Sequence, residues 1–324
     1  MADTKKIIKA AAGAAAAAAA GIAGLTAAGS YYFYKLAIPK NSGMTIKGRE
    51  TDPETQKKYD ARQKRYDDWI AGQTCEDWFV ESSDQLKLHA TFLPADVPSK
   101  MLMIVVHGYR SSGLWDFGEI LPAYKAMGFN ILMPDDRAHG KSEGDYIGFG
   151  WQDHFDVNRW IYYAITKLGS DVQIFLHGVS MGGATVMLCA GDPQPPQVKG
   201  IIEDCGYSSL NAEMEYCMKH YYKLPVEPFR SEVEFFAKFK ANYYDFEDCD
   251  CLRALEKATV PMLFIHGSAD TFVPKDMAIE NFSACNSEKK DLVIFEGSEH
   301  AESMLDDLAK YTAAVKKFVE ENKD

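Results

Sequence analysis

Short apolar runs recur along the chain from residue 75 onward, and polar segments that favour helix separate them. Two runs, WFVES and LKLHATFLP, alternate apolar and polar positions as a strand pair does. Six later runs are apolar on both faces: MLMIVVHG, NILMPDD, VQIFLHG, VKGIIEDCG, PMLFIHG and DLVIFEG. Helices are expected between them at 118–127, 151–168, 181–190, 275–284 and 302–321. Because strands buried on both faces alternate with helices, the pattern predicts an α/β fold, doubly wound around a mostly parallel sheet.

One segment, residues 207–255, interrupts this rhythm. It holds nearly fifty residues without such a strand, which is too long for a structureless connection inside a compact domain, and it is rich in Phe and Tyr. Two interpretations remain open, namely additional core helices and a small helical cap inserted over a ligand site. The aromatic surplus favours the cap.

The N-terminal 40 residues form a separate segment. Lys5, Lys6 and Lys9 precede the uncharged stretch Ala10–Ser30, and four aromatic residues follow it at 31–34. As a helix, these 21 residues would span roughly 31 Å, about the thickness of a hydrocarbon core. We therefore expect an uncleaved membrane anchor, with a cleaved signal peptide or a soluble Ala-rich tail as alternatives.

The polar segment 41–74 then reads as a lead-in helix or stalk, and 75–324 as the α/β domain. The N-terminal lysines favour an exported domain, although lysines and an arginine on the other flank weaken that asymmetry. We expect a membrane-anchored protein with an extracytoplasmic domain; a secreted or cytoplasmic protein is the alternative.

Charge and cysteine usage narrow the possible partners. The net charge of −12 and the absence of a basic stripe argue against nucleic acid. Seven scattered cysteines, several inside apolar runs, read as free buried thiols, and no Cys/His grouping has metal-ligand spacing. Neither a metal nor an organic cofactor is expected, and nothing in the composition indicates an oligomeric state.

Candidate catalytic residues stand where three of the apolar runs end. The stretch GVSMGG places Ser180 between a strand and a helix, the pattern of a sharp turn that exposes a nucleophile. Asp270 follows PMLFIHG and His300 follows DLVIFEG. Since the carboxyl ends of parallel strands share one edge of the sheet, all three should meet there. Asp204, at the end of VKGIIED, is the rival for the acid role.

These residue types suit acyl transfer. A serine hydroxyl needs an adjacent base, an imidazole can accept and return the proton, and a carboxylate fixes the imidazole's tautomer. The backbone N–H groups of Tyr109 and Met181 are placed to bind a tetrahedral oxyanion. Neighbouring polar residues are interpreted as loop scaffolding or buried packing: His107, Asp136, Arg137, His139 and His177.

Taken together, HGYRSSG, PDDRAHGKSEG, GVSMGG, FIHGSADTFVP and GSEHAES resemble the α/β-hydrolase superfamily. Within it the pattern is similar to bacterial, often membrane-anchored hydrolases related to serine aminopeptidases and monoacylglycerol lipases. The resemblance implies Ser180 as nucleophile, Asp270 as acid, His300 as base, and Tyr109 and Met181 as the oxyanion hole. Ala138 departs from it, because relatives often have glycine there.

The expected function is therefore a serine hydrolase that cleaves a small-molecule carboxylic ester through an acyl-enzyme. A serine aminopeptidase is the first alternative, since carboxylates of the 207–255 segment could hold a substrate ammonium: Glu213, Glu215, Glu232 or Glu234. A non-catalytic, membrane-tethered binding protein is the second.

Overall fold

The structure is a computed structural model that describes residues 23–40, 53–241 and 244–324. The chain divides into two compact units. The larger unit holds Glu50–Glu213 and Phe246–Asp324, and the smaller unit holds Met1–Arg49 and Met214–Asp245. Each unit is considered by itself.

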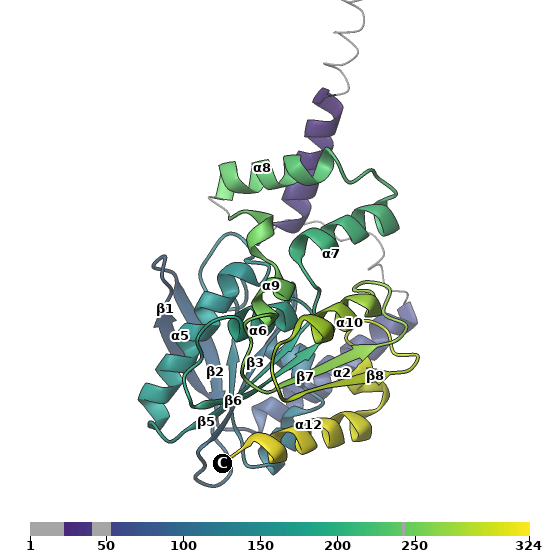
Figure 1. The fold of residues 1–324 in the computed structure, drawn as a ribbon. Coiled ribbons are helices and arrows are strands. Elements are labelled where there is room, and N and C mark those ends of the chain that lie inside the picture. Colours follow the sequence, from purple (N-terminus) through teal and green to yellow (C-terminus); the bar gives the residue numbers. More distant parts are fainter. Residues whose placement is uncertain (1–22, 41–52, 242–243) are drawn as a thin grey trace, which may run out of the picture. The chain divides into compact units, whose positions relative to one another are not determined.

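An eight-stranded sheet in the order β1-β2-β4-β3-β5-β6-β7-β8 forms the centre of the larger unit (Figure 1). The pairs β1–β2 and β2–β4 are antiparallel and all the others are parallel. Every apolar run identified in the sequence is one of these strands, so the predicted mostly parallel α/β fold is confirmed. The strands are β1 (Glu76–Glu81), β2 (Lys87–Leu93), β3 (Met101–Val106), β4 (Asn130–Pro134), β5 (Gln173–Val179), β6 (Val198–Asp204), β7 (Met262–Gly267) and β8 (Lys290–Phe295).

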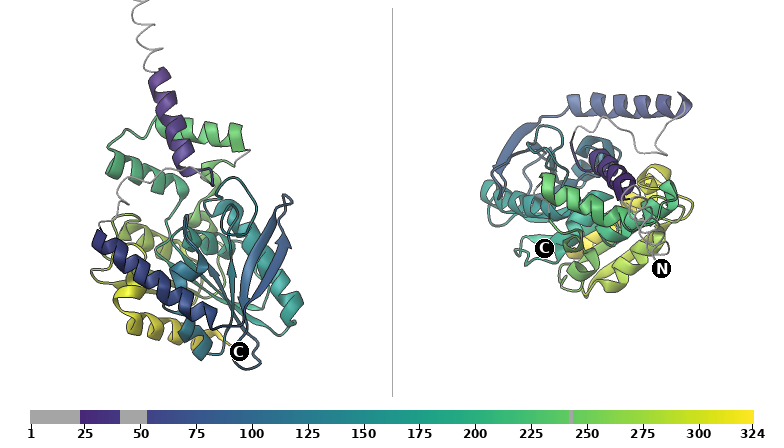
Figure 2. Two further views of the ribbon diagram at one scale, coloured as in Figure 1. Left: turned by 180° about the vertical axis from the view of Figure 1, so that it is seen from behind. Right: turned by 90° about the horizontal axis from the view of Figure 1, so that it is seen from above.

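Helices cover both faces of this sheet (Figure 2). One face carries α3 (Gly113–Phe117), α4 (Leu121–Ala126) and α12 (Leu308–Asn322), whose apolar side chains share a core with alternate strand residues. The other face carries α5 (Trp151–Leu168), α6 (Met181–Ala190), α9 (Cys251–Leu255) and α10 (Lys275–Ala284), each packed against the next. Helix α2 (Pro53–Ala71), in the expected lead-in segment, also packs on the larger unit through Tyr66, Trp69 and Ile70.

Two of the predicted helices are wrong in their extent. The expected helix 118–127 is shorter, because α4 begins only at Leu121, with Pro122 in its first turn. The separate short helix α3, capped by the hydroxyl of Ser112, precedes it and was not expected. The expected helix 302–321 is divided into α11 (Ser303–Asp306) and α12. Asp307 leaves helical geometry there, and its side chain accepts the N–H of Lys310 at 2.9 Å as a new cap.

In the smaller unit a helix at 23–37 packs against α8 (Phe229–Ala241). The hydroxyls of Ser30 and Thr26 donate to Glu232 at 2.7 and 3.2 Å, and the ring of Tyr31 meets that of Phe236 edge to face. The 207–255 segment also contains α7 (Leu210–Cys217), a π-helix at Met218–Tyr222 and a short 3₁₀ turn at Phe246–Asp248. Its described residues form these helices and the loops between them, and its role as a cap stays a prediction.

Most of the expected anchor, residues 10–22 of Ala10–Ser30, lies outside the described residues. In the described ranges, no helix combines the length and the apolar character that crossing a membrane requires. Three of the aromatic residues at 31–34, namely Tyr31, Phe33 and Tyr34, contact α8 and the π-helix within the smaller unit.

Candidate active site

Ser180 occupies a strained turn between β5 and α6. Its φ of 57° and ψ of −117° lie outside the regions that non-glycine residues favour, and such strain is typical of functional sites. Glycines permit the close packing around it. A Cβ on Gly178 would lie 2.0 Å from the carbonyl oxygen of Gly182, and one on Gly182 would lie 2.0 Å from that of Val106. This turn therefore projects the Ser180 side chain beyond the carboxyl end of β5.

His300 and Asp270 lie in line with this serine. The Nδ1 atom of His300 is 2.7 Å from Oδ2 of Asp270, and its Nε2 atom is 2.9 Å from Oγ of Ser180. A carboxylate only accepts, so Nδ1–H donates to it and Nε2 is left to accept the serine O–H. The structure thus brings together the three side chains that the strand ends predicted, with the polarity that proton transfer from Ser180 requires.

Asp270 is held by donors on both of its oxygens. Oδ1 accepts the backbone N–H groups of Phe272 and Val273 at 2.8 and 2.9 Å, and Oδ2 also lies 3.3 Å from Nε2 of His266. Burial alone would raise the pKa of Asp270, but the hydrogen bonds and charges of His266 and His300 hold it well below its usual range. Asp270 is therefore an anion at neutral pH.

Two backbone segments adjoin Ser180 where an oxyanion would form. Met181 is the first residue of α6, so its N–H belongs to the first turn, where helix amides have no intrahelical partner. Gly108 packs so closely that a Cβ there would lie 3.3 Å from Cβ of Ser180, and its N–H donates to Asp116 at 2.7 Å. This bond fixes the loop that carries Tyr109; the oxyanion role of both amides stays a prediction.

The polar residues expected to act as scaffolding fasten neighbouring loops. Nε2 of His107 accepts the N–H of Asp136 at 3.2 Å, and Nδ1–H of His139 donates to the carbonyl oxygen of Arg137 at 3.0 Å. The guanidinium of Arg137 is paired with buried Asp156 at 2.8 Å. These contacts tie the loops after β3 and β4 together.

Asp204, the rival for the acid role, is engaged elsewhere. Its Oδ2 accepts a hydrogen bond from the hydroxyl of Tyr311 at 2.7 Å. The hydroxyl oxygen of Tyr311 also lies 2.9 Å from Nε2 of His177. Nδ1 of His177 lies 2.5 Å from the hydroxyl oxygen of Tyr124. All four side chains are buried. Burial raises the pKa of Asp204 to about 6 and lowers that of His177 to about 3. Asp204 thus ends a buried hydrogen-bond chain and makes no hydrogen bond to His300.

The apolar side chains beside the site belong to no sequence motif, so the sequence alone did not identify them. The ring of Phe149 stacks on Tyr109 at 5.3 Å, and the two pack against a small cluster that includes Ile147 and Met181. The ring of Phe272 lies 5.0 Å from that of His300. The surroundings of the three polar residues are thus largely aromatic and aliphatic, which suits an apolar substrate group.

Comparison with known proteins agrees with this architecture. A family model described as the alpha/beta hydrolase fold matches residues 102–245, which include β3, the turn at Ser180 and the following helices. The chain has the alpha/beta hydrolase fold.

Proteins similar to this chain include the uncharacterized protein YqkD of Bacillus subtilis, 28% identical over 71% of the chain and 74% of YqkD. Human monoglyceride lipase is 26% identical over 64% of the chain and 77% of the lipase. Among solved structures, the Pyrococcus furiosus esterase Pf2001 aligns with a TM-score of 0.64 at 20% identity, over 87% of this chain and 99% of the esterase. This last likeness concerns the fold.

One grouping among the described residues brings together the side-chain types that bind metals. Sγ of Cys205, a carboxylate oxygen of Asp270 and a ring nitrogen of His300 lie within 4.8 Å of one another. Asp270 and His300 are hydrogen-bonded to each other, and burial with nearby carboxylates raises the pKa of the Cys205 thiol well above its usual value. Because a protonated thiol is a poor ligand, we assign no metal to this grouping.

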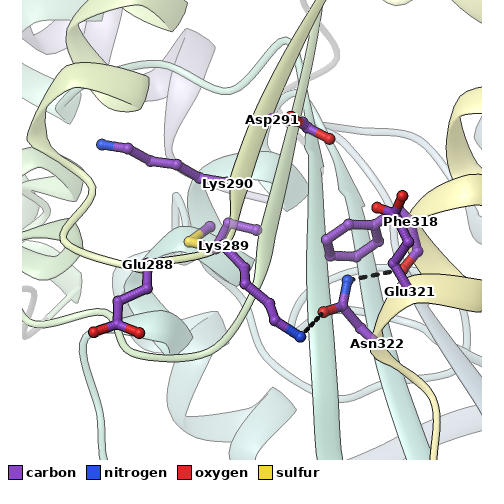
Figure 3. Close-up of a pocket in the computed structure, with 8 residues that line it drawn as sticks. Glu288, Lys289, Lys290, Asp291, Phe318, Glu321 and Asn322 are labelled. Carbon is purple, nitrogen blue, oxygen red and sulfur yellow. Dashed lines mark hydrogen bonds between the residues drawn. The ribbon is translucent and has the colours of Figure 1, made fainter.

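A cavity of about 330 Å³ lies in the larger unit, and Figure 3 shows the residues that line it. Met262 and Lys290 line it at the amino ends of β7 and β8, whereas Ser180 follows the carboxyl end of β5. Nζ of Lys289 lies 3.3 Å from Oδ1 of Asn322, and Lys290 donates to main-chain oxygens at the end of α10. Because its lysines bind other protein groups, this cavity carries no substrate assignment.

Proposed function

We propose that the protein is a serine hydrolase that cleaves a small-molecule carboxylic ester through an acyl-enzyme. The observation that carries this proposal is the continuous hydrogen-bonded line from Ser180 through His300 to Asp270, with Ser180 on a strained turn. Strain at a buried turn is retained where the surrounding structure imposes it, and here it directs a hydroxyl at a base.

In the proposed reaction, Nε2 of His300 takes the hydroxyl proton as Oγ of Ser180 attacks the ester carbonyl. The N–H groups of Met181 and Tyr109 bind the resulting oxyanion, and His300 then gives its proton to the departing alkoxide. A water molecule activated by His300 releases the acid and restores Ser180. Asp270 stays ionised and stabilises the imidazolium.

An ester is favoured over a peptide with a free amino terminus. A peptidase that cleaves peptides with a free amino terminus needs carboxylates that can bind the ammonium group. Glu232 already accepts the hydroxyls of Thr26 and Ser30, Glu215 is paired with Lys219, and Glu234 is paired with Lys238. The fourth candidate, Glu213, is a buried residue of α7. The names of the similar lipase and esterase point the same way.

We also propose that the N-terminal segment attaches this hydrolase to a membrane, with the catalytic unit on the extracytoplasmic side. The support is the uncharged stretch Ala10–Ser30 behind three lysines. Fractionation of cells that produce the full-length protein, with protease added to intact cells, tests both parts. A fully soluble chain contradicts the anchor, and a protease-protected chain contradicts the orientation.

A fluorophosphonate probe tests the catalytic proposal, because it reacts with serines that a neighbouring base activates. We expect labelling of the wild type, none of Ser180→Ala, and full labelling of Ser283→Ala, which alters an exposed serine on α10. A folded wild-type protein that is not labelled would indicate a binding protein. Parallel turnover of p-nitrophenyl esters and aminoacyl-arylamides then separates esterase from peptidase, and cleavage of the amides alone contradicts the ester assignment.

A further inference from the structure

A second imidazole lies behind the catalytic acid. His266, in β7, is fully buried, and its Nε2 atom is 2.9 Å from the carbonyl oxygen of Val273 and 3.3 Å from Oδ2 of Asp270. That oxygen is the one that accepts Nδ1–H of His300. Oδ2 of Asp270 therefore lies between two imidazoles, one that faces Ser180 and one that faces the interior.

A second buried carboxyl group, from the neighbouring strand, acts electrostatically on His266. Glu203, in the neighbouring strand β6, is fully buried, and its Oε2 accepts the N–H of Gly206 at 3.0 Å. Within the described part of the chain, Oε1 of Glu203 and Nδ1 of His266 are both buried without a hydrogen-bond partner. Two titratable groups on adjacent strands are thus each left with one buried polar atom that makes no hydrogen bond.

Three carboxyl groups act electrostatically on His266: Glu203 and Asp204 from β6, and Asp270 from the loop after β7. Burial would lower the pKa of His266, but the hydrogen bond to Asp270 and the charges of Glu203 and Asp270 raise it overall. Burial raises the pKa of Glu203 to about 8. The two groups are therefore coupled, because a charge on either one changes the pKa of the other.

We propose that His266 is a positioning residue that acts through Asp270 to set how tightly His300 holds a proton, and that the carboxyl group of Glu203 favours the cationic form of His266. This inference rests on the proposed function. When His266 is cationic, two charged donors share Oδ2 of Asp270. The carboxylate then stabilises a cationic His300 less. His300 therefore stays unprotonated down to a lower pH.

A purely structural role for His266 has a different signature. If it only held the turn at Val273, its removal would lower stability and leave the pH dependence of the chemistry unchanged. Glutamine at 266 separates the two roles, because its amide can donate to the same carbonyl oxygen but carries no charge. Glutamine at 203 likewise keeps the shape of the side chain and removes its charge.

The test is the pH dependence of the rate at which a fluorophosphonate inactivates Ser180, which requires no knowledge of the natural substrate. We expect the midpoint of the acid limb to rise by about one pH unit in His266→Gln, and by less in Glu203→Gln. The double variant should shift no further than His266→Gln, because both changes remove the same cation. The control is His154→Gln, which removes a buried imidazole of α5 that lies 3.6 Å from Asp192. We expect this variant to keep the wild-type midpoint.

An unchanged or lowered midpoint in folded His266→Gln overturns the inference. If that variant does not fold, as judged by thermal melting, Glu203→Gln alone decides by the same criterion. A wild-type protein that the probe never labels overturns the proposed function and this inference with it, whereas labelled variants without a shift overturn the inference alone.

Discussion

Asparagine at position 270 replaces one carboxylate oxygen by an amide nitrogen that can only donate. Every group around Asp270 donates to it: two backbone N–H groups at Oδ1, and His300 and His266 at Oδ2. The amide oxygen of Asn would keep the two backbone bonds, and its nitrogen would then meet Nδ1 of His300. The imidazole must move its proton to Nε2, where it can no longer accept the hydroxyl proton of Ser180.

The expected loss follows from that tautomer. A triad whose histidine is held in the wrong tautomer loses about 10⁴-fold in rate, or about 5 kcal/mol of transition-state stabilisation. We expect this loss in kcat, because the substrate-binding surface is unchanged. The variant should also lose some stability, since the low pKa of Asp270 means that the folded state favours its anion.

The assay compares inactivation by the fluorophosphonate and hydrolysis of p-nitrophenyl esters in wild type, Asp270→Asn and Asp276→Asn. Asp276 is an exposed carboxylate in the first turn of α10, and its variant should behave as wild type. A second variant, Asp204→Asn, addresses the rival acid and should retain activity within about 10-fold. Folded Asp270→Asn with a rate within 10-fold of wild type would refute the role of Asp270.

Three further changes test polar side chains in the two units. Tyr311→Phe removes the donor to buried Asp204 and should lower the free energy of unfolding by about 1–3 kcal/mol in chemical denaturation; no loss contradicts the hydrogen-bond chain. Burial raises the pKa of Asp153 to about 8, so its contribution to stability is complete below about pH 4 and lost as the pH rises toward 8. Asp153→Asn should flatten this decline in unfolding experiments across that range, and an unchanged slope argues against the shift. Glu232→Ala removes the acceptor of Ser30 and should speed amide exchange in both helices of the smaller unit; equal exchange rates argue against their packing.

Local sequence patterns were sufficient for most of the fold and for the positions of the candidate residues. The eight strands were visible because each is a short apolar run, and Ser180, Asp270 and His300 were found because parallel strands end at one edge of the sheet. Their chemical roles stay predictions until the probe is applied. The break at Asp307 was missed, because apolar periodicity continues across it and only the cap marks it.

Long-range polar contacts were not predictable in the same way. Tyr311 bonds to Asp204, 107 residues away, and lies beside His177, 134 residues away. Neither distance leaves a local signature, because a tyrosine in an amphipathic helix has the same appearance whether its hydroxyl meets water or a buried carboxyl. The position of His266 in an apolar strand likewise gives no local sign of its contact with Asp270.

The bond between Ser30 and Glu232 joins residues 202 positions apart, which gives the smaller unit an order of assembly. At about 5–20 residues per second, a ribosome needs roughly 10–40 s to add the intervening chain. Throughout that interval the helix at 23–37 has no α8 to pack against, and any membrane or chaperone that meets it first competes with its folded partner. Truncation at Asn41 removes this competition, but it also leaves Glu232 without both hydroxyl donors. The solubility of the shortened chain therefore reports on the state of α8 as well as on the anchor.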